Sequence, residues 1–169
     1  ENISNEFDSL YSRTLAMQFR FFAISKIKHF SKFGKTPKRI VKEQKDIISN
    51  LIKYWGTMDS MIGVMRWKRR LAVWLKENSS DTGLNPDAIS LIQEIAEFYR
   101  GRDARRYAYA RFDLINWQQT DETVDSAEEY NALLKDPDLP KDSKILIELL
   151  RRTAVNLKKE SKLDEAIII

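Results

Sequence analysis

The chain contains no cysteine and a single histidine, His29, among its 169 residues. Without thiols it has neither a disulfide framework nor a thiolate metal site, which fits either a reducing compartment or indifference to redox state. One imidazole excludes a histidine-pair zinc site and every catalytic arrangement that needs two imidazoles. We therefore expect neither a disulfide-stapled fold nor a histidine-based metal centre.

Glycine, proline and long apolar runs are also scarce. The five glycines are scattered along the chain, so the sequence contains no glycine-rich loop that could cradle a phosphate. The longest apolar runs reach only about half of the ~20 residues that a membrane span requires. No charged-then-apolar signal segment opens the chain. These absences predict a soluble, intracellular protein without a membrane span.

Strand signals are missing as well. The sequence shows no sustained polar/apolar alternation and no Asn-Gly or Asp-Gly hairpin, whereas a period of 3.6 residues recurs throughout. We predict an all-α protein, a single domain over residues 1–169 that forms a compact irregular bundle of about six or seven helices. The expected helices cover about residues 2–30, 38–55, 59–77, 86–100, 103–117 and 126–134, and a last helix begins near Pro140.

Capping residues mark two of these helix starts. Asn85 is followed by Pro86, the combination of an N-cap residue and a proline in the first turn. Asp103 precedes the next periodic stretch and is a second expected N-cap. On the helix that follows, Trp117 is expected on the polar side, where an exposed tryptophan would mark a contact surface.

The first helix has an apolar middle, because the stretch 15–24 is apolar at eight of ten positions. A helix through this stretch would be hydrophobic on nearly every side. We therefore expect the first helix to be central in the bundle, with Phe22 in the core.

Charge is distributed unevenly along the chain. The net charge is +4, but residues 1–76 contain 16 Lys+Arg and 6 Asp+Glu, giving +10, while residues 77–169 contain 13 and 19, giving −6. Such asymmetry predicts a polyanionic partner for the basic first half, or neutralisation of that half by the acidic-leaning second half. The acidic stretch 121–142 would then compete with the polyanion.

The region around the end of the first helix combines cations with aromatic rings. Phosphate recognition needs cations that reach a backbone, and base stacking needs exposed rings or guanidinium planes. The expected nucleic-acid-binding residues are Lys26, Lys28, His29, Lys32, Lys35, Lys38, Arg39 and Lys42 in the first two helices and their loop, Arg66, Arg69 and Arg70 on the third helix, and Arg105, Arg106 and Tyr109 on the fifth.

The preferred interpretation is a non-enzymatic protein or subunit that binds RNA or DNA and uses no metal and no cofactor. The alternative is a helical adaptor or structural subunit, whose basic half and acidic stretch 121–142 each meet a protein partner. A carboxylate-dependent enzyme is less favoured, although Glu94 and Glu97 are one helical turn apart. An ordinary solvated basic face and docking onto anionic lipid are the remaining interpretations.

Overall fold

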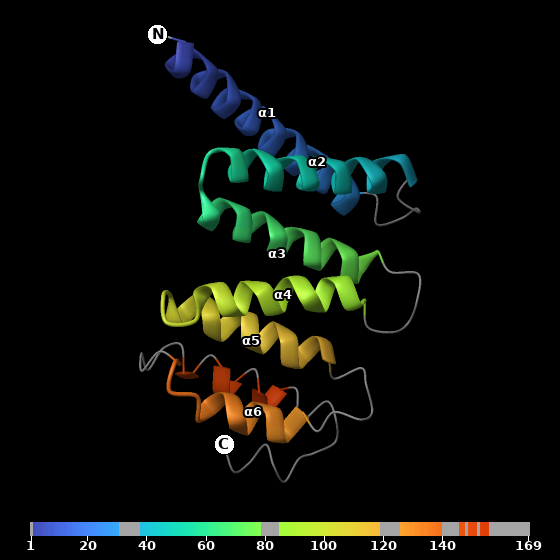
Figure 1. Cartoon of the computed structure of the whole chain (residues 1–169). Helices are drawn as coiled ribbons and strands as arrows, with labels where there is room; N and C mark the ends of the chain where they lie inside the picture. Colours follow the sequence, from blue (N-terminus) through green and yellow to red (C-terminus); the bar gives the residue numbers. More distant parts are fainter. Residues whose placement is uncertain are drawn as a thin grey trace. The chain divides into compact units, whose positions relative to one another are not determined.

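The computed structural model describes residues 2–30, 38–78, 85–118, 126–139, 146–147, 149–151 and 153–155. These residues form helices and turns and contain no strand, which confirms the all-α prediction. The helices are α1 (Asn2–Phe30), α2 (Lys38–Thr57), α3 (Met61–Glu77), α4 (Pro86–Tyr99), α5 (Ala104–Gln118) and α6 (Ser126–Leu134) (Figure 1).

The chain divides into two compact units, residues 1–80 and residues 81–169, which we call unit 1 and unit 2. This division lies close to residue 76, where the sequence changes from a net positive to a net negative half. Unit 1 is therefore the basic unit and unit 2 the acidic-leaning one. The expectation of a single domain over the whole chain stays a prediction.

In unit 1, α2 packs against both α1 and α3 (Figure 1). The buried side chains of α2 include Ile47, Ile48 and Leu51, whose spacing places them on one side of the helix. Between α1 and α3, the ring of Phe21 meets the ring of Trp67 edge to face, with centroids 5.2 Å apart. Apolar contacts from all three helices therefore form one core.

A glycine permits the close approach of α2 and α3. A Cβ atom at Gly63 would lie 2.5 Å from ring atoms of Trp55, which is closer than side chains can pack. Glycine in the middle of a helix is destabilising by roughly 0.5–1 kcal/mol relative to alanine. At Gly63 that cost is offset because Trp55 can lie directly against the backbone of α3.

The expectation that α1 is buried on nearly every side is wrong. Phe21 and Ile24 are buried, but the side chains of Phe19 and Phe22 are 67% and 51% exposed. Within unit 1, α2 is the helix with two packed neighbours, so α1 is not the central helix and Phe22 is not in the core. An apolar sequence shows which sides of a helix could be buried, whereas the neighbouring helices decide which sides are.

In unit 2, α5 packs against both α4 and α6. Phe112 of α5 lies against Tyr130 of α6, with ring centroids 5.7 Å apart, and Leu149 belongs to the same buried cluster. Trp117 is only 8% exposed, so the expectation that it lies on a polar side is wrong. A helix packed between two others buries more than one arc of its surface, and Trp117 falls within such an arc.

Both predicted caps are confirmed. The side-chain oxygen of Asn85 accepts hydrogen bonds from the backbone N–H groups of Asp87 at 3.1 Å and Ala88 at 3.2 Å. Asp103 accepts a hydrogen bond from the backbone N–H of Arg106 at 2.9 Å. Between α4 and α5, Gly101 has a φ of +67°, a left-handed conformation that glycine adopts without strain.

Candidate nucleic-acid interface

The clearest cationic feature of unit 1 is a set of exposed lysines along one side of α2. Lys38, Lys42, Lys45 and Lys53 are all exposed, and at 100° per residue they lie within an arc of about 80°. The buried residues of α2 lie on the other side of the helix. We call these four residues the lysine row of α2.

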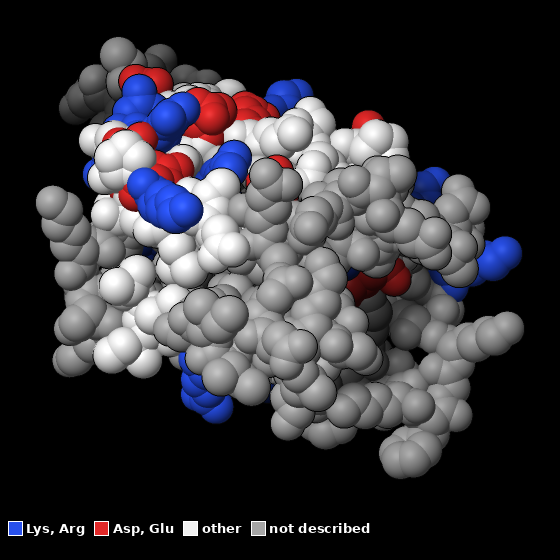
Figure 2. All heavy atoms as spheres, turned by 90° about the horizontal axis from the view of Figure 1, so that it is seen from below, with Lys and Arg blue, Asp and Glu red and all other residues white. Residues whose placement is uncertain are grey.

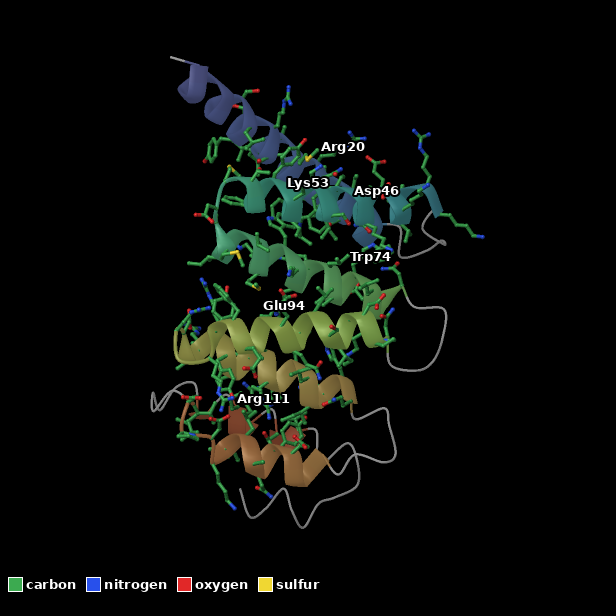
Figure 3. All side chains as sticks on the ribbon, in the orientation of Figure 1. Arg20, Asp46, Lys53, Trp74, Glu94 and Arg111 are labelled. Atoms are coloured by element: carbon green, nitrogen blue, oxygen red, sulfur yellow. The ribbon has the colours of Figure 1, made fainter. Side chains whose placement is uncertain are left out.

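Three members of the lysine row are available to an external anion. Within the segments that the structure describes, the side chains of Lys38, Lys42 and Lys53 make no hydrogen bond and no ion pair. The fourth, Lys45, has its Nζ atom 5.6 Å from the ring centroid of Trp74 on α3, within the range of a cation–π contact. Figure 3 labels Lys53 on α2 and Trp74 on α3.

An ion pair joins α1 to α2 beside this row. Arg20 of α1 contacts Oε1 of Glu43 on α2 with its Nη2 atom at 2.5 Å and its Nε atom at 2.7 Å. Glu43 is the one acidic residue in the stretch 20–45, so its charge is used between the two helices. Lys26 on α1 and Arg39 on α2 are exposed, as the sequence predicts for a solvent-facing site.

The arginines of α3 also face away from the core. Arg66, Arg69 and Arg70 are exposed, whereas Trp67 beside them is only 3% exposed. The helix α3 therefore has a core side and a cationic side. The three arginines belong to the same unit as the lysine row.

The predicted group on α5 belongs to unit 2 and has local contacts. The guanidinium of Arg105 lies 6.0 Å from the ring centroid of Tyr109. That of Arg106 lies 5.2 Å from the ring centroid of Tyr99 and forms an ion pair with Asp103 at 3.3 Å. These contacts occupy part of the donor surface of both arginines, so we treat this group separately from unit 1.

Four predicted residues fall where no side chain is described. Lys28 and His29 belong to α1, but their side chains are outside the described set. Lys32 and Lys35 lie between α1 and α2, outside the described residues. Their role in binding stays a prediction. The site predicted from the sequence did not include Lys45 and Lys53. Their positions on a helical wheel, close to those of Lys38 and Lys42, could have identified them.

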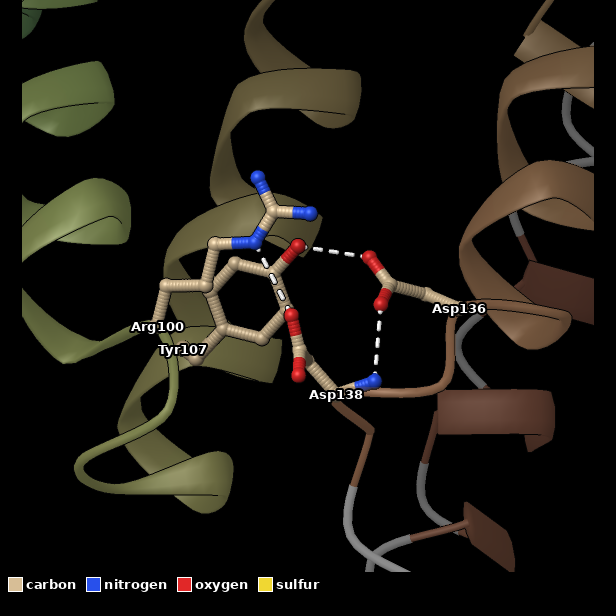
Figure 4. Close-up of polar contacts among 4 residues, drawn as sticks. All are labelled: Arg100, Tyr107, Asp136 and Asp138. Carbon is tan, nitrogen blue, oxygen red and sulfur yellow. Dashed lines mark hydrogen bonds and ion pairs between the residues drawn. The ribbon is translucent and has the colours of Figure 1, made fainter.

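Unit 2 contains a polar network between α4, α5 and the residues after α6 (Figure 4). The Nε atom of Arg100 donates to Oδ2 of Asp138 at 2.9 Å. The hydroxyl of Tyr107 donates to Oδ2 of Asp136 at 2.5 Å, and the backbone N–H of Asp138 donates to Oδ1 of Asp136 at 2.9 Å. The network ties the end of α6 to the neighbouring helices.

The network also shifts proton affinities. Burial raises the pKa of Tyr107 to about 12, and the hydrogen bond to Asp136 adds to the shift. The hydrogen bond to Asp138 raises the pKa of Arg100 above its ordinary value. Asp136 and Asp138 come from the acidic stretch 121–142, so these two acids act inside unit 2.

Charges of both signs are mixed on the face of the molecule that Figure 2 shows. Lys and Arg side chains lie beside Asp and Glu side chains at one corner of this view. The described residues contain no group of three or more His, Asp or Glu side chains that could hold a metal ion. The carboxylate interpretation therefore gains no support from Glu94 and Glu97.

None of the described helices has the length and apolar character needed to cross a membrane. Comparison of the chain with protein-family models, with curated proteins and with solved structures finds no match. The support for the candidate interface therefore comes from the charge and geometry of the chain itself.

Proposed function

We propose that the chain binds nucleic acid through unit 1, with the lysine row of α2 as the main phosphate-contacting surface. The observation that supports this proposal is the alignment of four exposed lysines opposite the core side of α2. From Lys38 to Lys53 the row extends about 22 Å at the helical rise of 1.5 Å per residue. A duplex carries one negative charge per ~1.7 Å of its axis, so the row spans many phosphates.

Lysines on flexible side chains act as point charges and contact phosphates without reading base edges. Each contact releases condensed counterions, so binding depends steeply on salt and weakly on sequence. Exposed Arg66 and Arg70 on α3 belong to the same unit and would add to its positive field. RNA and DNA are both suitable ligands for such a surface.

The test compares two double variants with the same change in charge. Lys42→Gln with Lys53→Gln removes two charges from the lysine row, while Lys135→Gln with Arg151→Gln removes two exposed charges from unit 2. The slope of log affinity against log salt should become shallower by about 1.4–1.8 for the first pair, at 0.7–0.9 per phosphate contact. The second pair should leave the slope unchanged.

Fluorescence anisotropy titrations with labelled single-stranded RNA, single-stranded DNA and duplex DNA, each at several salt concentrations, provide the slopes. Adding Lys38→Gln to the first pair should make the slope shallower by a further ~0.7–0.9, the value for one phosphate contact. Equal slopes for the two double variants would contradict the proposal and identify the row as an ordinary solvated face.

The second candidate function is that of an adaptor or structural subunit in a protein assembly. The observation that favours it is the exposure of four large apolar side chains on α1, a helix whose other side is packed in the core. Exposed apolar surface of this extent is typical of protein contact sites.

A further inference from the structure

The lysine row of α2 is interrupted. After Lys45 the next lysine is Lys53, about 12 Å further along the helix axis at 1.5 Å per residue. Exposed Asp46 and Ser49 occupy this gap. At 100° per residue Ser49 lies within the arc of the row, and Asp46 lies about 20° from Lys53. The row therefore has cations at both ends and hydrogen-bonding side chains in between.

Neither side chain in the gap is used inside the fold. Within the residues that the structure describes, Asp46 and Ser49 make no side-chain hydrogen bond and no ion pair. Helix α1 contacts α2 elsewhere, through polar contacts of Glu43 and Gln44, which lie more than about 100° from the middle of the row. Figure 3 labels Asp46 and Lys53 on α2. The gap is therefore open to a ligand that lies on the row.

A carboxylate within a phosphate-binding surface restricts the choice of ligand. An ionised carboxylate only accepts hydrogen bonds, and a phosphate placed beside it is repelled. The ligand must therefore present a hydrogen-bond donor to Asp46. Along a nucleic-acid backbone the donor next to the phosphates is the ribose 2′-hydroxyl, which RNA has and DNA lacks. Asp46 thus favours RNA and opposes DNA.

The order of side chains along α2 matches the groups across one groove of an RNA duplex. A-form RNA has a wide, shallow minor groove that displays 2′-hydroxyls, and proteins recognise it by 2′-hydroxyl and phosphate contacts across that groove. Lysines on the two sides of the gap would contact phosphates of the two strands. Asp46 and Ser49 would then lie over the 2′-hydroxyls between them, and the Ser49 hydroxyl can donate or accept.

We propose that the lysine row binds double-stranded RNA, with α2 across the minor groove and Asp46 accepting a hydrogen bond from a ribose 2′-hydroxyl. This inference rests on the proposed function, because it requires a nucleic acid on the lysine row. Duplex DNA and single strands also meet the lysines through their phosphates, so they bind as well, but more weakly.

Fluorescence anisotropy titrations of the full chain test the preference. The ligands are duplex RNA, duplex DNA of the same sequence and single-stranded RNA, all at one salt concentration. Duplex RNA should bind at least about tenfold more tightly than duplex DNA, because a hydrogen bond to a charged group contributes that much. Duplex RNA with 2′-O-methyl groups keeps its shape but has no 2′ donor, so it should bind about as weakly as duplex DNA.

Substitutions in the gap test the residues. Asp46→Ala should remove the preference, because the affinity for duplex RNA falls while that for duplex DNA rises. Ser49→Ala should weaken the binding of duplex RNA by a smaller factor. Glu97→Ala removes an exposed acid of unit 2 and should leave the ratio of the two affinities unchanged. Circular dichroism of each variant checks that the helices are retained.

The outcomes separate this inference from the proposed function. Equal affinities for duplex RNA and duplex DNA, an unchanged ratio in Asp46→Ala, or tighter binding of single-stranded RNA would overturn the inference and leave phosphate binding by the lysine row intact. No binding of any of the three ligands at low salt would overturn the proposed function together with the inference.

Discussion

A cation and a phenylalanine from each unit show two different uses of similar side chains. In unit 1, Lys42 and Phe22 are exposed to solvent, without a described ion pair for Lys42. In unit 2, Arg100 is bonded to Asp138, and Phe112 is buried against Tyr130. In these two pairs, the side chains of unit 1 lie at the surface, whereas those of unit 2 hold its helices together.

The comparison also shows why a cluster of cations in a sequence is ambiguous. Arg102 and Arg106 of unit 2 lie over aromatic rings, at 4.7 Å and 5.2 Å from the ring centroids of Phe98 and Tyr99. Such contacts satisfy cations within the fold. The lysine row of α2 differs because only Lys45 has a described contact of this kind.

The largest difference in stability is expected between two phenylalanine-to-alanine variants, one in each unit. Phe112→Ala leaves a cavity in the unit 2 core and should lower the free energy of unfolding by about 3–5 kcal/mol. Phe22→Ala removes a side chain that is 51% exposed and should change it by less than about 1 kcal/mol. Urea unfolding followed by far-ultraviolet circular dichroism gives both values. Equal losses would contradict the exposure of Phe22 at the surface of unit 1.

A smaller effect is expected from the tyrosine of the unit 2 network. Tyr107→Phe removes the hydroxyl that donates to Asp136, and the loss should be about 1–2 kcal/mol. The measurement is the urea midpoint at neutral pH. A change below the error of the measurement would show that the network contributes little to unit 2.

The same residue predicts a dependence on alkaline pH. The pKa of Tyr107 is raised to about 12 in the fold, above its ordinary value of 10.0, so above pH 10 the unfolded chain loses this proton first. The contribution of the Tyr107 hydroxyl to the free energy of unfolding is complete below pH 10. It is lost as the pH rises towards 12, by up to about 1.4 kcal/mol per pH unit. The difference in stability between the parent and Tyr107→Phe should therefore shrink over this range. A difference that stays constant would rule out the raised pKa.

The smallest contrast concerns single exposed cations. Arg100→Gln breaks the bond to Asp138 at the surface and should lower the free energy of unfolding only slightly, because exposed ion pairs contribute little to stability. Lys42→Gln should leave stability within about 0.5 kcal/mol of the parent. Thermal unfolding of both variants at low salt shows which substitution lowers stability more. A larger loss for Lys42→Gln than for Arg100→Gln would contradict this prediction.

Local features of the fold could be predicted from the sequence. The period of 3.6 residues identified the helices, and Asn85 and Asp103 marked two helix starts, because capping depends on a few neighbouring residues. The exposure of Phe22 and the burial of Trp117 could not be predicted, because they depend on which helices pack against α1 and α5.

The candidate site was predictable to a lesser extent. The predicted cations of α2 and α3, such as Lys42 and Arg66, are exposed, since amphipathic spacing separates cations from the apolar residues. Whether a cation has an internal partner was not predictable, because Asp138 is distant in sequence from Arg100. The same limit applies to Arg20 and Glu43, which meet only when α1 packs on α2.

Residue-resolved lysine labelling tests the central claim most directly. The full chain is treated with an amine-reactive reagent, with and without a single-stranded polynucleotide at low salt, and each modified lysine is quantified by mass spectrometry. The account predicts that Lys38, Lys42 and Lys53 are protected by the polynucleotide, while exposed Lys135 of unit 2 reacts equally in both samples. Protection of Lys135 with no protection of the three lysines on α2 would contradict it.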